Sequence, residues 1–391
     1  MRALHLPGVP DGSTPPFRFP DSPPKPADLD YTTADFPEPR PPPSPKATTP
    51  SYLLRVLTTA LTRGELTWAE ILEPSRFHAY GSAIPGHDVV GIVEKVFRVE
   101  GNETEASPPK YFPGDKVWAL LDFDRDGAAA TYTIALEHEL SLVPAIPPHI
   151  TNISPSQWNA VLATIPLSGL TGYQALFSHG HLPPSSLSTP DPRPSPQPRV
   201  LITGASGSVG APTLQLAKAA GFHVTAVCSS TSLPFVTDTL HADAVIDYTS
   251  ESFTSIPDAF ASRALAPVNL VIDCTGSALL QPILSSPASM LVRNAGRIVT
   301  VVAPLAVIAG SETQAAANQA ALDEAGVAAD FFIVKPDGVE LRVLGRLVEE
   351  GRLRGLVDEV FALEDGRDAM QVVESRGRRG GGKVVLRVAE E

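Results

Sequence analysis

Apolar residues follow two different patterns along this chain, and the pattern changes near residue 158. Before that point, short apolar or β-branched runs such as SYLLRVLTTAL (51–61) are separated by Gly, Pro and Asp, which is typical of strands. Beyond it, apolar runs such as VLITG (200–204) and NLVIDC (269–274) alternate with helical stretches such as APTLQLAKAAG (211–221). Strands that are fully apolar and alternate with helices predict a parallel, doubly wound sheet. The predicted fold class is α/β, with a β-rich part followed by such a sheet.

Two further elements are expected after the doubly wound part. The run ELRVLGRLVEEGRL (340–353) predicts an amphipathic helix, and KVVLRV (383–388) predicts a final strand.

Proline marks the segments that fit neither pattern. Fifteen of the 40 prolines lie in residues 1–50, including PEPRPPPSP at 37–45. Proline fixes φ and lacks an amide donor, so most of this region is expected to run as an extended coil, with one short strand at MRALHL (1–6). A second proline-rich stretch, 183–198, is interpreted as a surface loop or linker.

Composition and charge exclude some classes of function. The chain has 391 residues and a formal net charge of −13, which argues against nucleic acid as its main ligand. No apolar run approaches the roughly 20 residues of a membrane span, and the N-terminus lacks the apolar core of a signal peptide. With only two cysteines there is no disulfide framework, so a reducing compartment and a cytoplasmic location are expected.

The clearest chemistry lies in the glycine-rich turn VLITGASGSVG (200–210). A strand runs into the turn, and a helix and a further strand follow it, which is the order found in dinucleotide-binding units. Gly207 would let the backbone approach a pyrophosphate, and Gly210 would let helix and strand pack closely. The helix N-terminus would offer unpaired amides and a positive dipole end. A tight turn without a ligand is the alternative. The residues expected at the cofactor are Gly204, Ser206, Gly207, Ser208, Val209 and Gly210.

The strand after this turn bears on the choice between NADP and NAD. NAD-selective sites usually place an acid at the end of that strand, where it binds the ribose 2′-hydroxyl. Here the residues are Cys228, Ser229, Ser230 and Thr231, so hydroxyl donors would meet a 2′-phosphate, although no Lys or Arg follows nearby. NADPH is therefore expected, with NADH less favoured. Tyr248 would pack on the adenosine or fill the core.

Several motifs in series resemble those of the medium-chain dehydrogenase/reductases, and more narrowly the zinc-independent quinone oxidoreductase branch. They cover nearly the whole chain beyond residue 50. They are ALTRGELTW (60–68), IPGHDVVGIV (84–93), FPGDKVWAL (112–120), IPLSGLTGYQAL (165–176), HADAVIDYT (241–249), AGRIVTVV (295–302), FFIVKP (331–336) and GGKVVLRV (381–388). The resemblance implies a GroES-like β domain at 1–165 and 336–391 and a Rossmann domain at 166–335, with the active site between them.

The same resemblance predicts that there is no catalytic metal. Zinc-dependent relatives carry Cys, His and Cys at the positions of Thr62, His87 and Leu167. Only His87 keeps a ligand type, and a catalytic zinc needs three protein ligands and an open position.

The resemblance also implies positions for the remaining site residues. Thr171 and the backbone of Val301, Val302 and Ala303 would lie at the cofactor, and Phe332 would close the nicotinamide side or support the sheet edge. Thr62 would hydrogen-bond a substrate oxygen or the nicotinamide side. Tyr80 and His87 are further candidate donors. For each of these three donors the alternative is a structural role. Dimers through the sheet edge at 331–335 are a family expectation.

The run DFDRDG (122–127) is the first half of an EF-hand calcium loop when it is taken alone. Such a loop needs a bidentate Glu at its twelfth position, which here is Thr133, and its flanks are predicted strands. Calcium is therefore not expected. Two interpretations stay open: Asp122, Asp124 or Arg125 contacts substrate or nicotinamide, or the run is an Asp-rich turn with Arg125 paired to a carboxylate.

These observations predict an NADPH-dependent reductase that transfers hydride to a quinone or a conjugated double bond without zinc. Its partner would be a small-molecule acceptor, with no nucleic acid and no membrane. An enoyl reductase of a polyketide-type pathway is the second enzyme hypothesis. A third is a cofactor-bound scaffold with little turnover, in which PEPRPPPSP would be a docking ligand for a partner that binds polyproline II helices.

Overall fold

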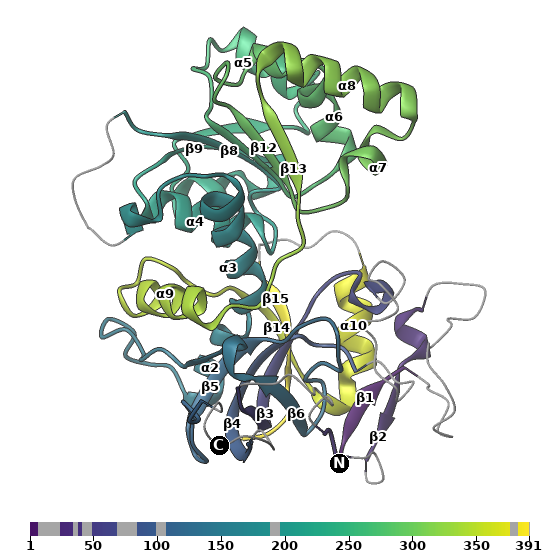
Figure 1. Cartoon of the computed structure of the whole chain (residues 1–391), viewed down its shortest axis with the longest axis vertical. Helices are drawn as coiled ribbons and strands as arrows, with labels where there is room; N and C mark the ends of the chain where they lie inside the picture. Colours follow the sequence, from purple (N-terminus) through teal and green to yellow (C-terminus); the bar gives the residue numbers. More distant parts are fainter. Residues whose placement is uncertain are drawn as a thin grey trace.

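The computed structural model describes residues 1–6, 24–33, 38–40, 49–68, 84–98, 107–187, 196–375 and 382–390 (Figure 1). Tyr80 and most of the proline-rich segments at 7–50 and 183–198 lie outside these ranges.

One half of the molecule is a six-stranded sheet in which every neighbouring pair of strands is parallel. Helices connect successive strands, as in Figure 1, where they cover the sheet. In spatial order the strands are β10 (Ala244–Asp247), β9 (His223–Cys228), β8 (Arg199–Thr203), β11 (Leu270–Asp273), β12 (Arg297–Thr300) and β13 (Ala328–Phe331). The connecting helices are α4 (Gly210–Ala219), α5 (Ile256–Ser262), α6 (Ser277–Ser285), α7 (Leu305–Ala309) and α8 (Glu312–Ala325).

The other half is a mixed sheet built around β3 and β4, which pair in antiparallel fashion. The last strand of the chain, β15, pairs with β3, so that Val384 lies opposite Leu61. The strands of this sheet are β3 (Ser51–Leu61), β4 (Asp88–Phe97), β5 (Lys116–Leu120), β6 (Tyr132–Leu136), β7 (Leu140–Leu142), β14 (Val357–Ala362) and β15 (Lys383–Arg387). The predicted α/β class, a GroES-like β domain with a Rossmann sheet, is confirmed.

Helices join the two sheets. In Figure 1, α3 (Pro166–Tyr173) and α9 (Gly338–Glu349) lie between the sheets, and α2 (Pro155–Ala163) lies beside the mixed sheet. The hydroxyl of Ser154 accepts the Gln157 N–H at 3.2 Å, and this N-cap fixes where α2 begins. One continuous buried cluster contains Trp118 of the mixed sheet, Leu344 of α9 and Val200 of the parallel sheet. The two halves therefore share a hydrophobic core. Every strand of the parallel sheet falls within 166–335, and every strand of the mixed sheet falls outside it.

A separate two-stranded antiparallel sheet lies next to the mixed sheet, where the N–H of Leu4 donates to Ala129 O. Strand β1 (Ala3–His5) pairs with β2 (Asp30–Thr32), and both lie near α10 (Gly366–Glu374), as Figure 1 shows. Among the described residues, no single helix has the length and apolar character needed to cross a membrane. The pair Pro155–Ala163 and Pro166–His179 meets that test only when it is taken together across a 41° bend.

Candidate active site

In the glycine turn between β8 and α4, the helix and the strand pack very close together. Gly204 has a positive φ of 60°, which favours glycine. A Cβ added at Gly210 would lie 2.8 Å from the Cα of Ala205 and would collide with the carbonyl oxygen of Gly204. The first turn of α4 therefore packs directly on the end of β8. This arrangement exposes a helix N-terminus at the carboxyl ends of parallel strands, where these folds bind dinucleotide phosphates.

Beside this turn, one buried carboxylate ties three strands together. The Oδ1 of Asp273 accepts the Thr203 hydroxyl at 2.7 Å, and its Oδ2 accepts the Thr300 hydroxyl at 2.9 Å. It also accepts the Thr275 hydroxyl and the Gly276 N–H. Asp273 thus fixes the carboxyl ends of β8, β11 and β12. The sequence pattern places Asp273 in an apolar strand, and the one signal of its role is an acid near the end of an otherwise apolar run.

The end of β9 carries the residues expected at the ribose. Ser229 shares a hydrogen bond with Thr231 at 3.0 Å, and Tyr248 is 40% exposed. The hydroxyl of Ser230 donates to Oδ2 of Asp247 at 2.7 Å. Hydrogen bonds from Ser230 and Thr249 lower the pKa of Asp247, so this carboxyl is ionised at neutral pH. Strand β10 pairs in parallel with β9 and brings Asp247 opposite Cys228, so a carboxylate from the neighbouring strand lies beside these serines.

The remaining predicted cofactor residues follow β12 and β13 or lie in α3. Val301 donates its N–H to Asp273 O at 3.1 Å, Val302 is 46% exposed, and Ala303 packs at the edge of the buried cluster under α6 and α8. The ring of Phe332 stacks on His179 with centroids 4.1 Å apart. The hydroxyl of Thr171 donates to Leu167 O within its own helix. The roles of these residues at the cofactor stay predictions.

On the mixed sheet, Thr62 belongs to a buried polar cluster that the sequence did not reveal. Lys383 at the start of β15 donates from Nζ to Oγ1 of Thr62 at 3.0 Å. The same Nζ forms an ion pair with Asp88 at the start of β4, and both side chains are almost fully buried. The Oδ1 of Asp88 accepts the N–H of Leu167 at 2.6 Å. Two positions that carry zinc ligands in metal-dependent relatives, Thr62 and Leu167, are thus linked through Lys383 and Asp88.

Two further titratable side chains lie beside this cluster. Burial raises the pKa of Glu65 to about 8, although the charge of Lys383 acts in the opposite direction. Burial lowers the pKa of His87 to about 4, so its ring is neutral at pH 7. Within the described residues, neither the carboxyl oxygens of Glu65 nor Nδ1 of His87 has a hydrogen-bond partner. The His87 ring lies 5.5 Å from Trp68 and 5.3 Å from Phe123. Buried, perturbed groups of this kind are typical of functional sites.

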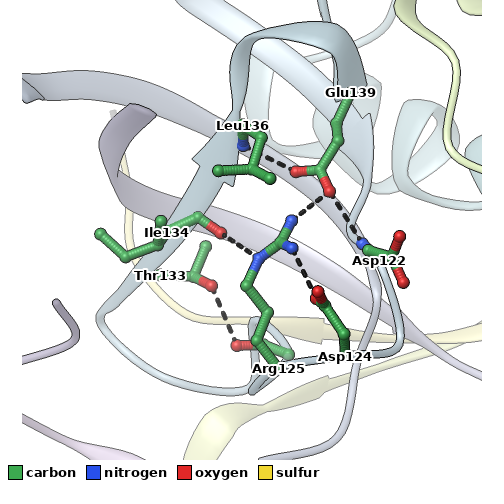
Figure 2. A network of polar contacts seen from close by, with 8 residues as sticks. Asp122, Asp124, Arg125, Thr133, Ile134, Leu136 and Glu139 are labelled. Atoms are coloured by element: carbon green, nitrogen blue, oxygen red, sulfur yellow. Dashed lines mark hydrogen bonds and ion pairs between the residues drawn. The ribbon is translucent and has the colours of Figure 1, made fainter. Parts of the chain in front are cut away.

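The DFDRDG run is held together by Arg125, as Figure 2 shows. The guanidinium donates to Asp124 Oδ1 at 2.8 Å, to the Ile134 carbonyl at 3.2 Å and to the buried carboxylate of Glu139. Glu139 also accepts the N–H of Asp122 at 3.1 Å. Each nitrogen of Arg125 thus has a protein partner. This geometry favours the interpretation as a turn braced by an ion pair over a contact of Arg125 with substrate.

Helix α3 connects the Thr62 cluster to the glycine turn. Its first turn contains Leu167, which is bonded to Asp88, and a Cβ added at Gly172 would lie 2.5 Å from the Thr213 hydroxyl of α4. At a rise of about 1.5 Å per residue, these two contacts lie roughly 7.5 Å apart along the helix axis. The polar cluster and the first turn of α4 therefore lie at the two ends of one short helix.

Comparison with known proteins identifies the family. Residues 240–386 match the family model described as zinc-binding dehydrogenase. A protein of Arthroderma benhamiae named probable zinc-binding oxidoreductase, mitochondrial, is 34% identical over 352 residues, which make up 89% of this chain and 92% of that protein. The chain belongs to the medium-chain dehydrogenase/reductase family.

This medium-chain dehydrogenase/reductase is also similar to a named reductase, and it shares its fold with a solved quinone oxidoreductase. The trans-enoyl reductase pgmF of Aspergillus terreus is 28% identical over 343 residues, 86% of each chain. The solved quinone oxidoreductase of Coxiella burnetii shares the fold, with a TM-score of 0.65 and 21% identity over 100% of this chain and 99% of that one. The protein is therefore an oxidoreductase, and its family is NAD(P)-dependent.

Because two of these descriptions mention zinc, the fit of the residues to a zinc ion matters. Of the three ligand positions, Thr62 offers a hydroxyl that already accepts from an ammonium group, and Leu167 offers no side-chain ligand. A zinc ion there would face the positive charge of Lys383. Among the described residues, no three His, Cys, Asp or Glu side chains form a group that could hold a metal ion. The side chains at these positions do not fit a catalytic zinc.

Proposed function

We propose that this oxidoreductase uses NADPH, without zinc, to reduce a quinone or a conjugated carbon–carbon double bond. One observation carries the proposal: at the positions where zinc-dependent relatives bind their metal, this chain has Thr62 bonded to the ammonium of Lys383. The glycine turn and the first turn of α4 would hold the pyrophosphate, and the bound nicotinamide would supply a hydride.

The chemistry of the acceptor supports this direction of reaction. Oxidation of an alcohol requires removal of the hydroxyl proton, which zinc assists by acidifying the oxygen bound to it. A quinone or an enone instead accepts hydride at carbon and spreads negative charge to its oxygen. A single hydrogen-bond donor is enough to stabilise that oxygen. The Thr62 hydroxyl accepts from Lys383 and would supply such a donor through its own proton, and the described side chains near it include no zinc ligand set.

The choice of NADPH rests on the end of β9. Cys228, Ser229 and Ser230 place no carboxylate on that strand, which supports NADPH. Asp247 acts against it, because its ionised carboxylate already binds the hydroxyl of Ser230. Measured dissociation constants for NADPH and NADH decide between these two influences.

An enoyl reductase of a biosynthetic pathway is the second candidate. It is favoured by the similarity to a trans-enoyl reductase over 86% of each chain. Both candidates need the same hydride transfer, and only the acceptor differs. A panel that includes quinones, simple enones and enoyl thioesters therefore separates them.

The first experiment follows NADPH oxidation by the purified full chain against that panel, with NADH, no acceptor and a metal chelator as controls. We expect turnover with one acceptor class, a lower KM for NADPH than for NADH, and no effect of the chelator. Loss of turnover in chelator that zinc restores would overturn the zinc-free mechanism. Tight NADPH binding without turnover on any acceptor would overturn the reductase proposal and favour the scaffold hypothesis.

Location and assembly are part of the same proposal. The cytoplasmic location stays a prediction; the relative from A. benhamiae carries a mitochondrial name. Strand β13 is the last strand in the order of the parallel sheet, which supports a homodimer through the predicted edge at 331–335. The mass in solution tests it: a monomer at micromolar concentration would contradict it.

A further inference from the structure

The hydrogen bond between Lys383 and Thr62 has a defined direction. A lysine ammonium has three donors and no acceptor, so Oγ1 of Thr62 must accept from it. The hydroxyl proton of Thr62 must then be directed away from Lys383. Thr62 is only half-buried, whereas Lys383 is almost fully buried. The cluster therefore presents one polarised O–H at its accessible end.

The charges behind Thr62 are fixed in orientation. Asp88 is completely buried, pairs with Lys383 and is held on its other oxygen by the N–H of Leu167. The pair is neutral as a whole, but its positive end lies against Thr62 and its negative end lies toward α3. In a region from which water is largely excluded, such a fixed dipole is worth more than in solvent, and it strengthens the next hydrogen bond in the chain.

We infer that Lys383 is a positioning residue that polarises Thr62, and that the Thr62 hydroxyl donates to the acceptor oxygen as negative charge develops there. In this arrangement the buried ammonium supplies the positive charge that a zinc ion would supply at the same positions in metal-dependent relatives. The inference rests on the proposed reductase function and assigns the group that recognises the acceptor carbonyl. It predicts that acceptors need a carbonyl oxygen conjugated with the carbon that is reduced.

A purely structural role for Lys383 makes a different prediction. If Lys383 only compensates the buried charge of Asp88, its loss affects folding and any effect on rate is independent of Thr62. If it acts through Thr62, its effect on kcat disappears once the Thr62 hydroxyl is absent. A double-mutant cycle separates the two, because coupling energies appear only between residues that act on one another.

The cycle uses Thr62→Val and the paired substitution Lys383→Met with Asp88→Asn, which removes both charges and so avoids leaving one of them buried alone. We expect Thr62→Val to lower kcat by about 100-fold, as removal of one donor to a developing oxyanion does, and Thr62→Ser to restore most of it. The paired substitution should lower kcat about 10-fold in the wild-type background and have no further effect in the Thr62→Val variant. The control, Lys218→Met with Asp243→Asn, removes a partly exposed ion pair between α4 and the residue before β10 and should leave kcat unchanged.

A binding measurement tests the inference without turnover. The probe is 4-nitrophenol, whose phenolate resembles the charged oxygen and has a distinct absorbance. We expect the bound probe to ionise at lower pH than the free probe, and both Thr62→Val and the paired substitution to abolish that shift. A normal kcat in Thr62→Val, or additive losses in the cycle, would overturn the inference while the reductase function stands. A Thr62-dependent shift of the probe in a protein without reductase activity would contradict the proposed function alone.

Discussion

Substitution of Arg125 can distinguish a residue that stabilises the fold from one that contacts a ligand. Its guanidinium is 4% exposed and compensates Glu139, whose side chain is fully buried. Replacing it by Met would leave that carboxylate buried without its partner. We expect Arg125→Met to lower the free energy of unfolding by about 3–5 kcal/mol, which urea denaturation would measure.

The neighbouring Asp124 provides the control for this prediction. It bonds the same guanidinium but is 44% exposed, so Asp124→Asn should cost about 1 kcal/mol or less. If Arg125→Met instead unfolds at the same urea concentration as the wild type and loses turnover, then Arg125 contacts the ligand, as the first interpretation of DFDRDG proposed.

The end of β9 allows a second prediction for single residues. Ser229→Asp would add a carboxylate where the 2′-phosphate is expected, so it should weaken NADPH binding more than NADH binding. Asp247→Asn should have the opposite effect and raise the affinity for NADPH by about fivefold. This factor corresponds to the roughly 1 kcal/mol of repulsion between two solvent-screened charges. Fluorescence titration with both cofactors measures the ratio. Ser286→Asp, at the exposed residue that follows α6, should not change the ratio. Equal effects of Ser229→Asp on both cofactors would contradict its placement at the ribose.

At the scale of elements, the contact between α4 and β8 should control cofactor binding. A methyl group at Gly210 would force α4 away from the turn, because its nearest neighbours are backbone atoms of Gly204 and Ala205. We expect Gly210→Ala to weaken NADPH binding by about 100-fold and to destabilise the fold by about 1–3 kcal/mol. Calorimetric titration with NADPH and thermal unfolding measure the two effects.

Gly345 in α9 is the matched control for that substitution. A Cβ there would meet its nearest atom, in Trp118, at 3.4 Å, which is an ordinary contact. Gly345→Ala should leave NADPH binding unchanged and stabilise α9 by up to about 1 kcal/mol through helix propensity. Equal effects of the two substitutions on cofactor binding would mean that the glycine turn does not hold the pyrophosphate.

Elements also show why the sequence predicted one part of the site and not the other. The glycine turn is local: strand, turn and helix follow one another within residues 199–219, so their order alone indicates a phosphate site. The Thr62 cluster is not local, since Lys383 lies 321 residues from Thr62 and 295 from Asp88. Only the antiparallel pairing of β15 with β3 brings Lys383 beside Thr62, and strand order is not encoded in any short motif. Asp247 beside Ser230 was missed for the same reason.

At the scale of the whole molecule, the buried titratable groups make stability depend on pH. Glu65 has a folded pKa of about 8 against an ordinary value of 4.5. The unfolded chain therefore loses this proton near pH 4.5, while the folded protein keeps it to about pH 8. The contribution of Glu65 to the free energy of unfolding is complete below pH 4.5, falls as pH rises and is lost above about pH 8. One such group changes stability by at most about 1.4 kcal/mol per pH unit.

Asp126 and His87 are also buried, but they change the free energy of unfolding mainly below pH 7. Burial raises the pKa of Asp126 to about 7, so its contribution to the free energy of unfolding also falls as pH rises, but this fall ends near pH 7. The pKa of His87 is lowered to about 4, so its contribution to the free energy of unfolding rises with pH, and this rise occurs below its ordinary pKa of 6.5. Burial also raises the pKa of the Asp88 carboxyl, which acts in the same direction as Glu65, so a substitution at Glu65 is needed to assign the change between pH 7 and pH 8.

We expect the free energy of unfolding of the wild-type protein, measured by urea denaturation, to fall between pH 7 and pH 8. Glu65→Gln should reduce that decline, because the amide does not titrate. Asp126→Asn should keep the decline above pH 7 and change only the behaviour below it. A wild-type protein with constant stability from pH 7 to pH 8 would mean that Glu65 is already ionised at pH 7. The buried site around Lys383 would then hold a second negative charge beside Asp88, and the ammonium would polarise Thr62 less.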